Sequence, residues 1–170
     1  MSDRPLDAER IFTALDRHDV RYVLVGGLAA QAHGDTRLTK DVDLCLEWTD
    51  ANQGDMAAAL RELGGRLIFE GTSMELTPDA QLMRGMELGN WETTAGQIDV
   101  LLGIPQRSRT KLARYDTLER GAVILDISGH QVTVAALRDI IRSEEIADRP
   151  KDQEALSELR ALDGRDTEAP

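Results

Sequence analysis

The stretch VGGLAAQAHGDTRLTKDVDLCL, residues 25–46, carries the two features that decide the fold. The first is the pair Gly26-Gly27 after an apolar run, where glycine allows a tight turn from a strand into a helix. The second is the alternation that begins at Asp41 and Asp43, because every second side chain of a strand points to the same face. The two carboxylates are therefore predicted to lie side by side, with the intervening apolar residues on the opposite face.

The composition indicates one globular domain in a chain of 170 residues. Aromatic residues make up only 4% of the chain, so small aliphatic side chains must build the core. The net charge of -11 opposes nonspecific attraction to nucleic acid or to an anionic membrane. The apolar runs of the chain are too short to span a bilayer, and the N-terminus lacks the apolar centre of a signal peptide. We therefore expect a cytoplasmic protein without a membrane partner.

Helical and strand patterns alternate along the chain, which predicts an α/β or α+β domain with a central sheet. Strands are expected at residues 21–25, 41–47, 66–70 and 97–102, with a hairpin of residues 122–127 and 131–135. Helices are expected at residues 6–18, 28–33, 55–63, around 137–141, and from Pro150 to about residue 162. The segment 71–96 has the weakest pattern, with a helix near 78–86 and a strand near 88–93.

A run of basic residues follows the strand at 97–102. Residues 105–120 are expected to form a loop and a helix, which places Arg107, Lys111 and Arg114 on one helical face. Such a face either is solvated or contacts a polyanion, and solvation is the commoner case.

A third acid, Asp99, stands in the predicted strand 97–102, on the face opposite its apolar residues. A close pair of carboxylates on one strand and a single one on another is the oxygen-rich set that two divalent metal ions need. Asp41, Asp43 and Asp99 are therefore the predicted metal ligands. The glycine turn adds backbone N–H groups that can approach phosphate oxygens closely.

The order and spacing of these residues resemble the signature of the DNA polymerase β-like nucleotidyltransferase superfamily. That signature is an apolar residue, Gly-Gly, 13 intervening residues and then Asp-apolar-Asp-apolar. The string GGLAAQAHGDTRLTKDVDL is similar to the minimal and AbiEii-type bacterial nucleotidyltransferases, several of which are toxins of toxin–antitoxin systems. Residues 132–159 resemble their C-terminal helices, with Arg-x-Lys-Asp at residues 149–152.

The resemblance implies a nucleotidyltransferase fold, in which a small mixed β-sheet is flanked by helices. It implies a single domain over residues 1–164, with C-terminal helices at about 135–163 and a polar tail at 165–170.

The resemblance also implies roles for individual residues. Asp41, Asp43 and Asp99 become the catalytic metal ligands, and Asp99 is also a candidate to deprotonate the acceptor. The residues implied in nucleotide binding are Gly26, Gly27, Arg37, Thr39 and Lys151. An alternative for Arg37 is an ion pair with a nearby acid. Relatives often carry a lysine near position 144, where this chain has Glu144.

Together, the residues and the resemblance predict an enzyme that transfers a nucleoside monophosphate from an NTP to an acceptor hydroxyl. Two Mg²⁺ ions, with Mn²⁺ as an alternative, are the implied cofactors. A toxin-like member would modify RNA, such as tRNA ends, or a protein, and would have an antitoxin protein as a partner. One alternative is an aminoglycoside-type nucleotidyltransferase that modifies a small molecule. Another, favoured by Glu144, is a non-catalytic nucleotide-binding or interaction module of the same fold.

Overall fold

The computed structural model describes residues 5–108, 110–147 and 150–166. The strands are β1 Tyr22–Val25, β2 Asp41–Leu46, β3 Arg66–Phe69, β4 Thr72–Met74, β5 Leu88–Thr93, β6 Gly96–Leu101, β7 Gly103–Ser108, β8 Lys111–Arg114, β9 Val123–Ile127 and β10 His130–Val134. The helices are α1 Ala8–Arg17, α2 Gly26–Ala32, α3 Asp50–Glu62, α4 Ala80–Arg84, α5 Tyr115–Glu119, α6 Leu137–Ala147 and α7 Pro150–Asp166.

The described residues form one eight-stranded mixed sheet and one two-stranded sheet. The larger sheet has the strand order β4-β3-β5-β6-β2-β1-β10-β9, and the smaller consists of β7 and β8. β2 pairs in parallel with β6, and β1 pairs in parallel with β10, while the other neighbours are antiparallel. This arrangement confirms the predicted α/β class with a mixed sheet and flanking helices.

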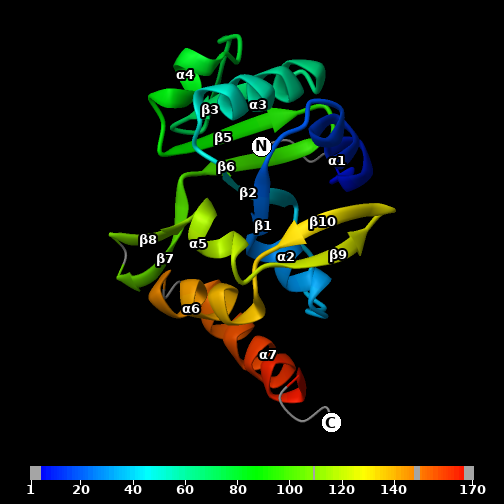
Figure 1. Ribbon diagram of the computed structural model, residues 1–170, viewed down its shortest axis with the longest axis vertical. Coiled ribbons are helices and arrows are strands. Elements are labelled where there is room, and N and C mark those ends of the chain that lie inside the picture. Colours follow the sequence, from blue (N-terminus) through cyan, green and yellow to red (C-terminus); the bar gives the residue numbers. More distant parts are fainter. Residues whose placement is uncertain (1–4, 109, 148–149, 167–170) are drawn as a thin grey trace.

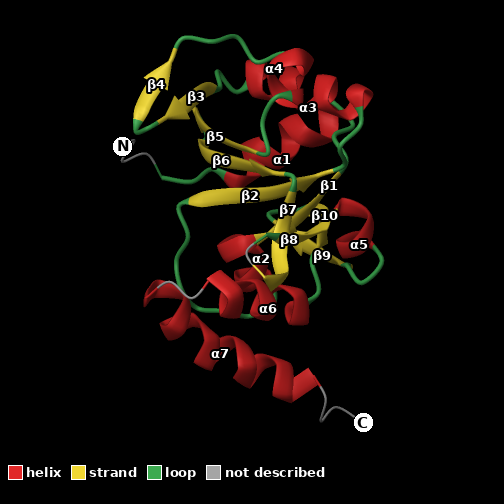
Figure 2. Ribbon diagram, turned by 90° about the vertical axis from the view of Figure 1, so that its left-hand side faces the viewer, coloured by secondary structure: helices red, strands yellow, loops and turns green. Residues whose placement is uncertain are grey.

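Two groups of helices lie at opposite ends of the molecule (Figure 1). α1 packs on α3, and α3 packs on α4. α6 packs on α7, β7 and α2, and Figure 2 shows α6 and α7 together at the end of the molecule that carries the C-terminus. In the part of the chain that the structure describes, no helix is long and apolar enough to cross a membrane.

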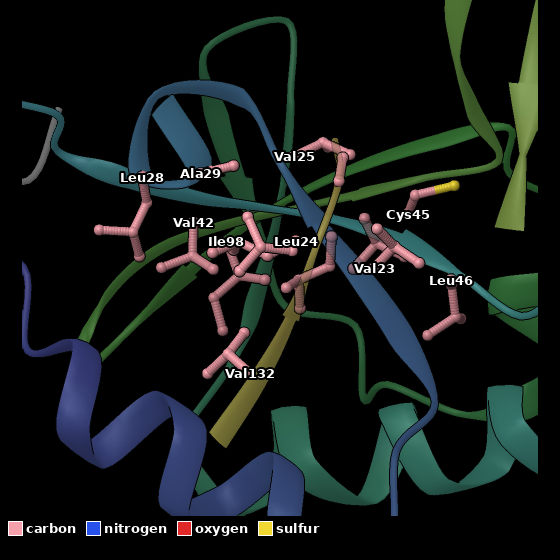
Figure 3. Packing of buried hydrophobic residues seen from close by; sticks show 14 of the residues in the cluster. Val23, Leu24, Val25, Leu28, Ala29, Val42, Cys45, Leu46, Ile98 and Val132 are labelled. Carbon is pink, nitrogen blue, oxygen red and sulfur yellow. The ribbon is translucent and has the colours of Figure 1, made fainter. Parts of the chain in front are cut away.

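The core lies mainly between the larger sheet and α1 with α3. Figure 3 shows Leu24, Val42 and Ile98 gathered on the side of the sheet that faces α1, while Val25 and Cys45 point the other way. All five side chains are buried. The predicted alternation of β2 therefore holds, because its even-numbered residues are packed into the core and leave the odd-numbered ones for the opposite face.

The basic segment differs from the prediction. Instead of a helix that aligns Arg107, Lys111 and Arg114, the chain forms the antiparallel hairpin β7–β8. Lys111 and Arg114 are three residues apart on one strand, so they point to opposite faces and form no common basic stripe. The reason is tertiary burial: Ile104 and Ala113 are register partners, and both are buried. All three basic side chains are exposed, as expected for solvated residues.

Several helix boundaries also differ from the predicted ones, most clearly those of α3 and α7. α3 begins at Asp50 rather than residue 55, because the Thr49 side chain caps it by accepting a hydrogen bond from Asn52 N (3.3 Å). α7 extends to Asp166, beyond the predicted end near residue 162 and into the segment assigned to a polar tail.

Asn52 joins α3 to the strands that carry the site. Its Oδ1 accepts a hydrogen bond from Arg21 N (2.7 Å), and its Nδ2 donates to Arg21 O and Glu47 O (both 2.8 Å). Arg21 precedes β1 and Glu47 follows β2, so one 2% exposed side chain ties the adjacent ends of these two strands.

Asn52→Ala is expected to lower the free energy of unfolding by about 3 kcal/mol, because three backbone groups lose a buried partner. Urea denaturation followed by circular dichroism measures the change. Gly54→Ala is the control in the same helix: a Cβ there meets no atom within 4 Å, and the helix should gain up to about 1 kcal/mol. Equal stability of Asn52→Ala and wild type would show that the carboxamide does not hold the strands.

Candidate active site

A row of polar side chains crosses three neighbouring strands on the face opposite the core. Asp43 of β2 is the register partner of Asp99 of β6, and Asp99 is in turn the partner of Asn90 of β5. On the other side of Asp43, its partner in β1 is Val25. Register partners in adjacent strands point to the same face, so the structure brings Asp43 and Asp99 together as the sequence predicted.

Gly26 stands immediately beyond this row, at the turn from β1 into α2. Its φ of 69° lies in the left-handed region that favours glycine. A Cβ at this position would overlap the Asp43 carboxylate, so only glycine allows the backbone and this acid to approach so closely. A Cβ on Gly27 would lie 2.9 Å from Thr39 Oγ1. Both predicted glycines therefore border the acids.

The acids are oriented by neighbouring polar side chains. Thr39 Oγ1 donates a hydrogen bond to Asp41 Oδ1 (2.8 Å), and Gln97 Nε2 donates to Asp99 Oδ1 (3.1 Å). Gln97 is also the register partner of Asp41. Thr39, which the sequence singled out for phosphate contact or loop support, thus lies beside a predicted metal ligand and holds its carboxylate.

Arg37 is held in the loop that precedes β2. Its guanidinium donates from Nε to both carboxylate oxygens of Asp35 (3.1 and 3.0 Å) and pairs with Oδ2 through Nη2. Burial raises the pKa of Asp35, but the hydrogen bonds from Arg37 outweigh it and leave the pKa below its usual value. Thr36, in the same loop, donates from N (3.0 Å) and Oγ1 (2.8 Å) to Glu158 Oε1 of α7. The loop is thereby anchored to the C-terminal helix.

A cleft of about 780 Å³ is lined by the predicted acids and glycines together with Asn90, Thr39, Asp35 and Arg37. Its charged lining residues in the described part of the chain are Asp35, Arg37, Asp41, Asp43, Asp99 and Glu144. Its apolar wall is formed by Leu38, Leu88, Leu101, Ile104, Pro105 and Ile140. Leu38 is 95% exposed, which is unusual for a large apolar side chain and places it at the rim. The cleft is therefore strongly acidic, with an apolar side.

The chemistry of this lining fits a hard divalent cation. Carboxylate and amide oxygens, the ligands that Mg²⁺ prefers, line the cleft together at Asp43, Asp99 and Asn90, and the bare Cα of Gly26 lets the backbone approach the Asp43 carboxylate. As the side chains stand, no group of three or more His, Cys, Asp or Glu within the described residues is arranged to hold one metal ion. A bound cation would therefore require these side chains to change their rotamers.

Four further residues concern the site, of which two were named from the sequence and two were not. Lys151 lies in α7, but its side chain falls outside the described part of the structure. Glu144 lines the cleft where a lysine was expected by resemblance. Sequence reasoning missed Asn90 and Gln97. The spacing of Gln97 two residues before Asp99 was an available signal, whereas Asn90 lies in the poorly patterned segment 71–96.

Comparison with solved structures identifies the fold. The chain superposes on the solution structure of the antibiotic-resistance factor ANT(2'')-Ia with a TM-score of 0.56 and 19% identity, over 91% of this chain and 80% of that one. The crystal structure of ANT(2'')-Ia in complex with adenylyl-2''-tobramycin superposes with a TM-score of 0.54 and 19% identity, over 93% of this chain and 95% of that one. The crystal structure of a Thermotoga maritima protein assigned as a nucleotidyltransferase superposes with a TM-score of 0.51 and 12% identity, over 94% of this chain and 86% of that one.

These likenesses show that the chain has the nucleotidyltransferase fold, as the sequence motifs predicted. No protein-family model and no curated protein matches the sequence.

Gly26→Ala is expected to destabilise the protein more than Gly129→Ala, as measured by urea denaturation. Both residues have a positive φ (69° and 83°), so alanine costs about 1–2 kcal/mol of backbone strain at either position. A Cβ at Gly129 meets no atom within 4 Å, whereas one at Gly26 displaces Asp43, which adds about 1–3 kcal/mol. Equal losses would mean that Asp43 moves aside freely and that Gly26 does not shape the site.

Proposed function

We propose that the protein is a metal-dependent nucleotidyltransferase that transfers a nucleoside monophosphate from an NTP to an acceptor hydroxyl and releases pyrophosphate. The observation that carries the proposal is the pairing of Asp43 with Asp99 in adjacent parallel strands, beside a glycine turn that leaves no room for a side chain. The nucleotidyltransferase fold supports the same reaction class.

The three predicted acids and the two glycines each have a task in this reaction. Asp41, Asp43 and Asp99 would hold two Mg²⁺ ions, which would supply charge stabilisation at the attacking and leaving oxygens. Backbone N–H groups of Gly26 and Gly27 would hold phosphate oxygens. The acceptor oxygen bonds to the α-phosphorus as the bond from that phosphorus to the bridging oxygen breaks.

The remaining steps concern the acceptor proton and the geometry of the acids. Asp99 is the proposed recipient of the acceptor proton, and pyrophosphate leaves. Thr39 keeps the Asp41 carboxylate in position, and Gln97 keeps the Asp99 carboxylate in position, through the hydrogen bonds described above.

The charge of the cleft favours a cationic acceptor. Among its described lining residues, five acids stand against a single base, Arg37, which is already paired with Asp35. A nucleotide brings further negative charge, so a polycationic molecule would be attracted and a polyanion repelled. The structure of ANT(2'')-Ia with adenylyl-2''-tobramycin, the nucleotidylated form of a cationic aminoglycoside, supports a small-molecule acceptor of this kind.

An RNA or protein acceptor is the second candidate. It is supported by the toxin-like sequence resemblance and by the exposed bases of the β7–β8 hairpin, whose Gly103 and Pro105 line the cleft. An antitoxin partner belongs to this candidate alone. A cationic small molecule and RNA make opposite demands on the charge of the cleft.

The reaction is tested with Mg²⁺ and α-³²P-labelled NTPs, adding aminoglycosides, total RNA or cell extract in separate incubations. Asp43→Asn is expected to lower label transfer by about 100-fold or more, because one oxygen of the charged site is lost. Asp116→Asn, an exposed acid of α5 outside the cleft lining, is the matched control and should transfer label like wild type. Absence of any label that depends on Asp43 would refute the enzymatic proposal and favour a non-catalytic module.

Glu144→Gln separates the two classes of acceptor. Removing one negative charge from the cleft is worth about 1 kcal/mol, or roughly a fivefold change in an equilibrium constant. We expect the KM for the NTP to fall and the KM for a cationic acceptor to rise. If the acceptor is RNA, the KM for the RNA should fall instead.

Glu145→Gln is the control for this experiment. Glu145 lies on the same helix but pairs with Arg160 (2.6 Å) and does not line the cleft, so both KM values should stay unchanged. Equal effects of the two substitutions would show that the result reports the overall charge of the protein and not the cleft.

A further inference from the structure

Asn90 extends the row of site residues onto β5. It is the register partner of Asp99, which is the partner of Asp43, so three oxygen-bearing side chains follow one another across three adjacent strands. All three line the cleft. The row thus contains one neutral amide next to two carboxylates.

The carboxamide oxygen of Asn90 lacks a hydrogen-bond donor. Its Oδ1 is shielded from solvent and, among the described residues, accepts no hydrogen bond. An amide oxygen in this condition costs about 1–3 kcal/mol. The contrast is Gln97, whose amide nitrogen donates to Asp99 Oδ1 (3.1 Å).

The neighbours of Asn90 indicate what would satisfy this oxygen. An amide oxygen carries a partial negative charge and a carboxylate a full one, so Asp99 does not stabilise Oδ1, whereas a cation between them attracts both. Mg²⁺ and Mn²⁺ accept such oxygens as ligands. The terminal torsion of asparagine is broad, and Asn90 lines the cleft, so its amide group can reorient there.

We propose that Asn90 supplies an additional oxygen to the divalent cation held by Asp43 and Asp99. The inference rests on the proposed function, because it takes the cation site from it. It adds a ligand on a third strand, so that the position of the cation would depend on β5 as well as on β2 and β6.

Mn²⁺ titration tests this directly, with free Mn²⁺ measured by electron paramagnetic resonance and no nucleotide or acceptor present. Asn90→Leu is expected to weaken Mn²⁺ binding by about tenfold, in the range found when groups that support a metal site are lost. Asn90→Asp should bind Mn²⁺ more tightly than wild type, because it adds a negative charge. The metal-free Asn90→Leu protein should be at least as stable as wild type, since it loses an unsatisfied polar atom.

Gln53→Leu is the matched control. Gln53 Oε1 is the same kind of atom, buried and without a hydrogen-bond partner among the described residues, but Gln53 lies in α3 and does not line the cleft. Its substitution should leave Mn²⁺ affinity unchanged. A loss of affinity equal to that of Asn90→Leu would show that both act through packing, and this would overturn the inference.

The failure of this inference and that of the proposed function give different results. If wild type binds Mn²⁺ more tightly than Asp43→Asn does, and Asn90→Leu binds as tightly as wild type, Asn90 is not a ligand and the cation site stands. If wild type and Asp43→Asn bind Mn²⁺ equally, the cation site itself is wrong and both proposals fall.

Discussion

The candidate site depends on the register in which β2 pairs with β6. This register places Asp43 opposite Asp99, and it is held by the buried partners Val42 and Ile98, which are packed on the other face. A slip of one residue would turn the acids into the core and the apolar residues into the cleft. The carboxylates are thus brought together by hydrophobic packing, which can offset the repulsion between like charges.

The same register explains why a glycine turn and an acid pair occur together in one stretch of sequence. β1 pairs with β2 so that Val25 is opposite Asp43, and Gly26, the next residue along the chain, therefore lies beside this acid. Any side chain at that point would overlap the carboxylate. The Gly-Gly and Asp-x-Asp motifs are therefore two parts of one constraint, set by the antiparallel pairing of β1 and β2.

The sequence predicted the parts of this site that follow from local periodicity. Alternation along a single strand was enough to place Asp41 and Asp43 on one face, and the glycine turn follows from local backbone freedom. Asn90 escaped prediction because its importance comes from β5 pairing with β6, and pairing is a property of topology. The β7–β8 hairpin was missed for a related reason, since the burial of Ile104 and Ala113 against the rest of the fold overrides helical spacing.

The charges around Arg37 constrain how a triphosphate could be bound. Arg37 is the only base among the described residues of the cleft lining, yet it is hydrogen-bonded to Asp35, which is only 6% exposed. Drawing the Arg37 guanidinium away would leave the buried carboxylate without its charged partner, with a hydrogen bond from Arg37 N (3.1 Å) remaining, which costs about 1–3 kcal/mol. Among the described lining residues, cations held by the acids would therefore stabilise a bound triphosphate more than Arg37 does. The acids that make the cleft unfavourable for an anion by themselves are the groups that would make it favourable once cations are bound.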